Sequence, residues 1–460
     1  MAIRIFRELR EERPPSAASQ ERLDHVVTKL SAESDTLRVR FWGDDGDPPD
    51  LSLYERLMAL TRDTLAIAPD HPQALTDHGS FLGHAPFIGR ANFLDENWRQ
   101  TTLLTLRRAA ANNPDDVAAQ RNLGNYYLTT EGQPSLALPY LQNAAHLADA
   151  EAPYANNWPY YQLASALHQT GQPVAALRVL ERAPHDPTID QLSYWTEPFI
   201  ATRRFDEALT FLRAHTPRLT AADDGRNALT LDHLVTDMEA RWSGDRESLR
   251  PFVARLDDEP FATAGMRCRY RLAVGDYTGV LEQLAAVEPG RDPYAPNPIE
   301  MALFRGLALA RTGNQSLAHS FFRSVLNRFT TGPEAEMMLQ RVPGIVHSSS
   351  AFMHAGLGQV DEMHTSIAAA RASTDPGRNL QNYLQTEYLI ALAYTEAGAV
   401  TEACATINQL LSAPSAESTG SILANVSFDA LHDTPEFQAL IRQHQNQLKD
   451  PAIIDRLFTE

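Results

Sequence analysis

The sequence contains very little cysteine and lysine. Its two cysteines, Cys268 and Cys404, lie far apart and neither belongs to a CxxC cluster, so neither a disulfide framework nor a zinc site is indicated. Of the 40 basic residues, all but Lys29 and Lys449 are arginines. This bias indicates a GC-rich bacterial genome, and the sparse cysteines fit a reducing compartment.

Long apolar runs are also missing. No stretch approaches the roughly 18 apolar residues that a membrane-spanning helix needs. The opening residues MAIRIFRELREERPP spread charges throughout and lack the basic-then-apolar order of a signal peptide. We therefore predict a cytoplasmic protein with no membrane insertion.

Sequence motifs of common enzymes are absent. A phosphate-binding Walker loop needs GxxxxGKS or GxxxxGKT, and neither lysine follows a glycine. The kinase motifs, HExxH and GxSxG are missing as well. We predict no cofactor and do not expect an enzyme, and any catalysis would have to be unconventional.

The chain is acidic, with a formal net charge of -18 and a pI of about 5.3. DNA, RNA and anionic membranes would repel such a surface, and no cluster of arginines supplies a basic patch. The charge therefore predicts no nucleic-acid partner. A cationic or neutral partner fits better, although an excess of Asp and Glu is usually only a solvated outer face.

Strand patterns are nearly absent, whereas helical ones fill the chain from Leu51 onward. Short polar breaks separate helices of a dozen or so residues. Residues 1–50 differ, because they combine a Pro/Ser break with the acidic, turn-rich segment WGDDGDPPD. We predict an all-α protein that begins with a partly irregular N-terminal arm or cap.

The breaks between helices recur at spacings of roughly 34 to 45 residues. They read TEGQPSLAL, QTGQPVAAL, ATRRFDEAL, AVGDYTGVL, RTGNQSLAH, GLGQVDEMH and EAGAVTEAC. A glycine at such a break can adopt the positive φ that ends one helix, and the next helix then starts antiparallel to it. The pattern predicts a series of helical hairpins.

Two hairpins carry small residues at fixed places. In the first, Gly124 lies between Leu123 and Tyr127, and Ala137, Leu141 and Ala144 follow in the second helix. In the next, Leu163, Ala164 and Leu167 are followed by Ala176, Leu180 and Ala183. Small residues at these places allow two helices to cross closely.

These hairpins resemble the tetratricopeptide repeat (TPR) family. Weaker units in the same phase include Thr196 with Ala208 and Leu212, Gly306 with Ala318 and Phe322, Ala351 with Met363, Ile367 and Ala370, and Ala391 with Ala403 and Ile407. The resemblance implies a right-handed α-solenoid of antiparallel helix pairs, a TPR-like superhelix. The last piece, FDALHDTPEFQALIRQH, resembles in part the segment that closes such arrays in bacterial regulators.

From these patterns we predict five regions. They are an N-terminal arm or cap over 1–50, an N-terminal array over 51–218 with an insertion near 85–97, a divergent repeat or bend over 219–258, a C-terminal array over 259–420, and capping helices over 421–460.

The densest set of potential metal ligands is DHPQALTDHGSFLGH, which contains His71, Asp77, His78 and His84. Metal binding would need two imidazoles on one helical face, but His78 and His84 are six residues apart and would lie on different faces. We therefore favour packing and loop contacts over a metal site. If the chain were an enzyme, this histidine-rich region would be its candidate site.

The concave groove is the better candidate for binding, because the resemblance implies that first helices line it. The register of the two strong repeats places aromatic, basic and polar residues there, which suit interfaces. The alternative is that the aromatic side chains only pack between neighbouring helices. The predicted groove residues are Arg121, Asn125, Trp158, Tyr161, Ser165, His168 and Glu197.

Three functions stay open at this point. The favoured one is a non-catalytic scaffold that binds a protein or peptide partner in the groove. The second is a regulator that senses a small ligand or signal peptide, and the third is an unconventional enzyme. Self-association into a homo-oligomer is compatible with each of them.

Overall fold

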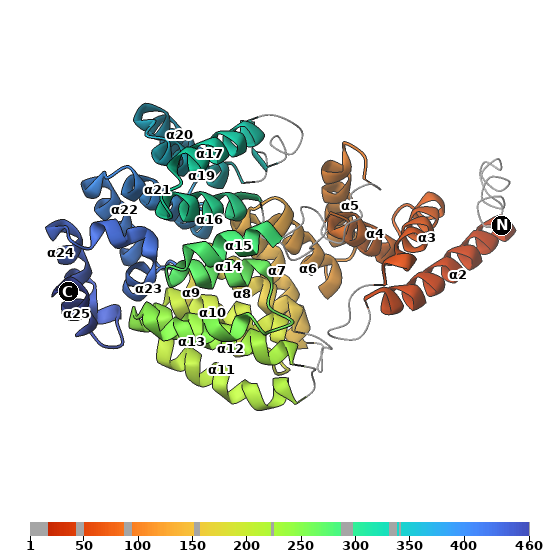
Figure 1. The fold of residues 1–460 in the computed structure, drawn as a ribbon. Coiled ribbons are helices and arrows are strands. Elements are labelled where there is room, and N and C mark those ends of the chain that lie inside the picture. Colours follow the sequence, from red (N-terminus) through yellow and green to blue (C-terminus); the bar gives the residue numbers. More distant parts are fainter. Residues whose placement is uncertain are drawn as a thin grey trace. The chain divides into compact units, whose positions relative to one another are not determined.

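A computed structural model describes residues 17–42, 50–86, 94–150, 157–221, 225–286, 298–330, 338–339 and 342–459 (Figure 1). These residues form helices joined by turns and bends. The chain divides into two compact units: unit 1 comprises Met1–Ala166 and Arg182–Asp186, and unit 2 comprises Leu167–Glu181 and Pro187–Glu460. Residues 1–16 and 43–49 of the predicted arm, and 87–93 of the predicted insertion, lie outside the described residues.

The helices of unit 1 follow one another as packed neighbours, α3 on α4, α4 on α5, α5 on α6 and α6 on α7. An aromatic cluster joins its first helices, where the Phe41 and Phe81 rings meet edge to face at 5.6 Å. The helices are α2 (Ala17–Trp42), α3 (Tyr54–Ile67), α4 (Pro72–His84), α5 (Trp98–Asn112), α6 (Val117–Asn125) and α7 (Pro134–Ala150). Helix α8 (Trp158–Gln169) begins in unit 1 and ends in unit 2.

Unit 2 continues the same arrangement with more helices. A single large apolar cluster runs from Cys268 to Ile454 and includes residues of α14 through α25. The longer helices are α9 (Pro173–Leu180), α10 (Leu192–Ala201), α11 (Phe205–Thr220), α12 (Arg226–Ser243), α13 (Arg250–Leu256), α14 (Ala264–Ala273), α15 (Tyr277–Ala286), α16 (Pro298–Arg311), α17 (Gln315–Thr330), α19 (Pro343–Gly356), α20 (Val360–Ala372), α21 (Leu380–Glu396), α22 (Val400–Ser412), α23 (Thr419–Ala424), α24 (Pro435–Gln443) and α25 (Ile453–Thr459).

The predicted breaks are confirmed as turns between helices. Each glycine break has a glycine with φ between +59° and +79°, at Gly132, Gly171, Gly275, Gly313, Gly358 and Gly398. The break ATRRF has no glycine, and there Arg203 itself adopts a φ of 60°. Its guanidinium donates to the Ile200 carbonyl at 2.9 Å, which helps to hold this unfavourable conformation.

The close crossing expected at small residues is confirmed as well. A Cβ atom on Gly124 would lie 2.6 Å from Cγ of Leu141, and Leu141 is fully buried. Ala164, Ala351 and Ala391 are also fully buried. The all-α class and the packing of successive antiparallel helices therefore agree with the sequence, whereas the predicted boundaries between arrays stay a prediction.

Two helices of unit 2 that are far apart in sequence also touch. Helix α12 packs on α11, its neighbour in sequence, and on α23, which lies near the C-terminus. Among the described residues, the segment 219–258 therefore does more than connect two parts of a stack. It supplies a surface on which α23 packs.

We expect opposite effects from alanine at two helical glycines of unit 1. Gly83→Ala should raise the free energy of unfolding by up to about 1 kcal/mol, because alanine favours helix and its Cβ would meet only ordinary contacts at 3.6 Å. Gly124→Ala should lower it by about 1–3 kcal/mol, because the new methyl group overlaps the buried Leu141. Denaturant unfolding followed by circular dichroism measures both. Equal effects of the two substitutions on the free energy of unfolding would show that the crossing of α6 and α7 does not need a glycine at position 124.

Candidate functional site: a cavity on the inner face of unit 2

The predicted groove residues of unit 1 differ in exposure. Arg121 and Asn125 on α6, and Trp158 and Ser165 on α8, are partly exposed. Tyr161 is fully buried, with the Asn157 amide 3.4 Å from its hydroxyl. Tyr161 thus packs in the interior of unit 1 and offers no surface to a partner in this structure.

The two remaining groove residues, His168 and Glu197, belong to unit 2 and lie together. His168 Nε2 is 3.8 Å from a Glu197 carboxylate oxygen. Burial lowers the pKa of His168 to about 4, so the imidazole is neutral near pH 7 and the contact is not an ion pair. The Glu197 side chain is 60% exposed, yet desolvation by the surrounding protein raises its pKa while Arg241 opposes the rise. As a binding set, the seven groove residues remain a prediction.

The histidine-rich segment forms α4 and its N-cap. The His71 ring accepts a hydrogen bond from the Ala74 amide at 3.3 Å, and Nδ1 of His84 donates to the Ser80 carbonyl at 2.7 Å. His78 lies 2.9 Å from the Thr61 hydroxyl. Within the described residues, no group of three or more His, Cys, Asp or Glu could hold a metal ion. These contacts are those of helix capping and packing.

Asp77 in the same helix is an unusual buried carboxyl group. It is 4% exposed, and its nearest cation is Arg38 Nε at 3.6 Å. Burial raises the pKa of Asp77 to about 6, although Arg38 and a hydrogen bond from Gln73 oppose the rise. One oxygen, Oδ2, has no hydrogen-bond partner among the described residues. Ionisation of the Asp77 carboxyl group therefore destabilises the folded state.

A cavity of about 780 Å³ lies in unit 2. This volume is within the range of ligand-binding pockets in proteins. Its walls come from helices far apart in sequence, namely α12, α14, α16, α19, α21 and α23. The lining residues are Asp237, Ala240, Arg241, Leu249, Arg269, Tyr270, Leu272, Ala273, Phe304, Leu307, Met338, Val342, Ile345, Gln385, Tyr388, Leu389, Leu392, Glu417, Ser421, Ala424, Asn425, Val426 and Ser427.

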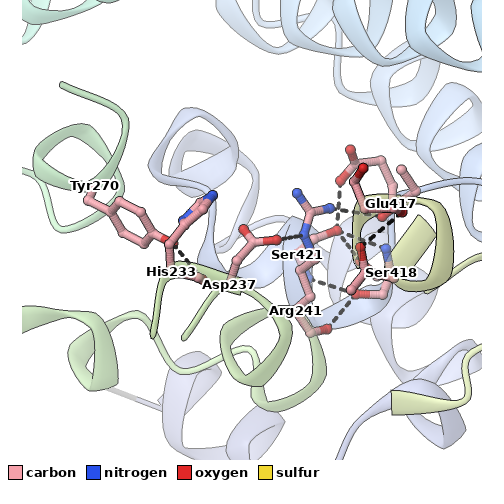
Figure 2. Close-up of polar contacts among 10 residues, drawn as sticks. His233, Asp237, Arg241, Tyr270, Glu417, Ser418 and Ser421 are labelled. Atoms are coloured by element: carbon pink, nitrogen blue, oxygen red, sulfur yellow. Dashed lines mark hydrogen bonds and ion pairs between the residues drawn. The ribbon is translucent and has the colours of Figure 1, made fainter. Parts of the chain in front are cut away.

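The polar end of this cavity is built around Arg241. Figure 2 shows Arg241 between Asp237 on one side and Glu417, Ser418 and Ser421 on the other. Its Nε donates to an Asp237 oxygen at 2.6 Å, and its Nη1 donates to the Ala416 carbonyl at 2.9 Å. Burial opposes ionisation of Asp237, but Arg241 outweighs it, so the pKa of Asp237 is lowered and the pair stays charged.

Neutral hydrogen-bonding groups continue this polar end. The Tyr270 hydroxyl lies 2.7 Å from Nδ1 of His233, and Asn425 donates to the Tyr388 hydroxyl at 2.6 Å. Burial raises the pKa of both tyrosines, so their hydroxyls stay protonated. The cavity thus joins a long apolar wall to an end with a charged pair and several neutral donors and acceptors.

Sequence reasoning missed this site. One available signal was the spacing of His233, Asp237 and Arg241, which follow one another at four-residue steps and so share a face of α12. The lining residues between Glu417 and Ser427 show no such pattern in sequence. They lie beside α12 only because α23 packs against that helix in the folded chain.

The comparisons with known proteins identify no family for the chain. No family model matches it, and no curated protein matches it. Among solved structures, it is similar to the TPR domain of P58(IPK), with 12% identity, a TM-score of 0.27 and coverage of 94% of this chain and 96% of that one. It is also similar to the pentatricopeptide repeat protein PPR10 from maize, with 13% identity, a TM-score of 0.26 and coverage of 100% and 80%.

A second structure of PPR10 contains an 18-nt psaJ RNA element and matches with 12% identity, a TM-score of 0.23 and coverage of 99% and 88%. At these TM-scores the likeness carries no argument about function, and the fold class rests on the helices of the chain itself. The comparisons therefore do not test the exclusion of nucleic acid. That exclusion stays a prediction from charge.

Membrane association can be addressed through helix length and hydropathy. In the ranges that the structure describes, no helix is both long and apolar enough to span a bilayer.

We expect Asp77→Asn to stabilise unit 1 in a pH-dependent way. A raised pKa in the folded state favours folding below the unfolded pKa of 3.8, and this contribution is lost as the pH rises through about 6. The stability of the variant relative to the parent should therefore increase by about 2 kcal/mol between about pH 4 and about pH 7. Denaturant unfolding at both pH values measures the change.

Asp115→Asn is the matched control, because it removes a carboxylate from an exposed position. Its stability relative to the parent should show no comparable change with pH. If the difference in stability between Asp77→Asn and the parent does not change between these two pH values, Asp77 is better solvated than the structure shows.

Proposed function

We propose that this protein is a non-catalytic binding protein that holds a segment of a partner protein, or a peptide, in the cavity of unit 2. The observation that carries this proposal is the pairing of a long apolar wall with a polar end in one concave site. A peptide has matching parts, since its side chains can be apolar while its backbone offers both donors and acceptors. Sites of this kind bind through a few anchors in a desolvated pocket.

The charges of the cavity favour a segment with little net charge. Arg241 and Arg269 are balanced by Asp237 and Glu417, so the formal charges of the lining residues cancel. An anionic polymer such as RNA would find no excess of positive charge here, and the chain as a whole carries -18. These observations support a peptide over a nucleic acid.

The pKa values around the cavity support binding over catalysis. Asp237 has a lowered pKa because Arg241 outweighs the effect of burial, whereas burial raises the pKa of Tyr270 and lowers that of His233. Proton transfer near neutral pH works best with a group that titrates near neutral pH. The pKa shifts of Asp237, Tyr270 and His233 move these three groups away from neutral pH.

A second candidate surface lies in unit 1. Trp158 and Arg121 are partly exposed there, and both are residue types that contribute strongly to interfaces. Together with Asn125 and Ser165, they form the part of the predicted groove that a partner could reach. A ligand-sensing role remains the alternative to the scaffold role, because the cavity is also large enough for a small molecule.

The cavity can be tested by filling it. Ala273 is partly exposed and lines the cavity, so Ala273→Trp should place an indole where the partner segment would bind. We expect at least a tenfold loss of affinity, about 1.4 kcal/mol. The partner is first captured with the tagged parent chain and identified by mass spectrometry, and its binding segment is then titrated by calorimetry as a purified peptide.

Ala368→Trp on the exposed face of α20 is the matched control and should bind as the parent does. The double variant Arg121→Ala with Trp158→Ala separates the two candidate surfaces. Loss of binding in this double variant, with normal binding by Ala273→Trp, would place the partner on unit 1 and refute the cavity.

A further inference from the structure

In unit 2, the end of α12 and the helix α23 meet at a contact that leaves no room for a side chain at Gly420. A Cβ atom on Gly420 would lie 2.3 Å from the Arg241 carbonyl oxygen and 2.9 Å from the Gly244 nitrogen. Gly244 itself has a φ of +72°, which favours glycine. Backbone therefore rests directly on backbone where the end of α12 meets α23.

Hydrogen bonds surround this contact and span large separations in sequence. Arg203 donates to the Ser415 carbonyl at 2.9 Å, and the Lys449 amide donates to the Trp242 carbonyl at 2.9 Å. The Ser418 hydroxyl donates to the Arg241 carbonyl at 2.5 Å. We call this set, with the Gly244–Gly420 contact and the bond from Arg241 to Ala416, the clasp.

An ion pair completes the clasp outside the cavity. Arg246 Nη1 contacts both carboxylate oxygens of Asp429 at 2.8 Å, and neither residue lines the cavity. The two side chains are 27% and 39% exposed, so solvent reaches the pair. Arg246 is therefore a place where the clasp can be weakened without touching the cavity walls.

Among the described residues, the buried apolar side chains on the two sides of the clasp belong to different clusters. The buried residues Leu229, Leu231 and Met238 of α12 belong to three smaller apolar clusters. Ile422 and Leu423 of α23 belong to the large cluster of unit 2. The clasp is thus largely a polar and backbone contact between separate cores, and it can open while both cores stay intact.

The clasp also completes the cavity. Asp237 and Arg241 come from one side of it, and Glu417, Ser421 and Asn425 come from the other. Opening of the clasp would separate these two groups and remove the polar end as a single surface. A segment that touches both groups therefore has a differential affinity for the closed form.

We propose that binding of a peptide in the cavity is coupled to closure of the clasp, so that the bound peptide holds α12 and α23 together and opening of the clasp releases it. This inference rests on the proposed function of the cavity. By linkage, any change that opens the clasp weakens peptide binding, and peptide binding closes the clasp to the same degree.

Two variants at residues that do not line the cavity test the coupling. Gly420→Val opposes closure because its side chain would overlap the backbone of Arg241, and Arg246→Ala removes the ion pair to Asp429. Arg213→Ala is the matched control, since it removes an exposed ion pair to Glu239 that joins neighbouring helices α11 and α12. Circular dichroism and thermal unfolding establish that each variant folds, and Arg246→Ala serves if Gly420→Val does not.

Closure is measured without any ligand by electron–electron distance spectroscopy. Spin labels are attached in a Glu247→Cys, Ala430→Cys background, at two exposed positions on opposite sides of the clasp. The native Cys268 and Cys404 are buried and are replaced by alanine for this experiment. We expect one short distance in the parent and in Arg213→Ala, and longer distances in Gly420→Val and, to a smaller extent, in Arg246→Ala.

The binding probe is a peptide selected from a displayed random library on the parent chain, with counter-selection on Ala273→Trp. Its affinity should fall about tenfold or more in Gly420→Val, within the usual range of coupling between sites, and stay unchanged in Arg213→Ala. Added peptide should shift the distances in Arg246→Ala back toward the parent value.

The possible failures are distinct. If no peptide survives counter-selection, the proposed function fails and the coupling fails with it. If distances lengthen in Gly420→Val but the peptide binds as tightly as to the parent, the cavity stands and the coupling is wrong. If the distances do not change in either variant, the contact is not a clasp that opens, and the coupling is again refuted.

Discussion

A stack of helix pairs has a basic problem at its ends, because each pair buries one apolar face against the next and the last pair has no neighbour. In unit 2, helix α23, which lies near the C-terminal end, packs against α12 from an earlier part of the stack. The backbone of α23 at Gly420 rests on the backbone of α12 at Arg241 and Gly244. The inner face of unit 2 depends on this contact, because residues from both of its sides form the polar end of the cavity.

Much of the fold could be predicted because its causes are local. A glycine such as Gly313 ends one helix by adopting a positive φ, and a small residue such as Gly124 permits a close crossing, so both leave a trace in sequence. The closure could not be predicted in this way. Ser418 and Arg241 are 177 residues apart. The sequence around either residue gives no indication that the two lie in contact.

The candidate site was harder to predict than the fold, for a related reason. The register that places Tyr161 on a groove is equally compatible with packing between neighbouring helices, and only the three-dimensional structure shows that Tyr161 is fully buried. On α12, the four-residue steps from His233 to Arg241 indicate a shared polar face but not what that face opposes. Sequence patterns identify faces of single helices, whereas this cavity is a property of helices that meet from distant parts of the chain.

Arg241 connects the chemistry of the cavity to the closure of unit 2. The same guanidinium that holds Asp237 at the cavity wall also donates to the Ala416 carbonyl across the clasp. A strongly anionic ligand that drew Arg241 away would leave the half-buried Asp237 without its partner and would break a bond across the clasp. A ligand with little net charge leaves both contacts in place. The preference for a neutral segment and the closure of unit 2 therefore follow from the same side chain.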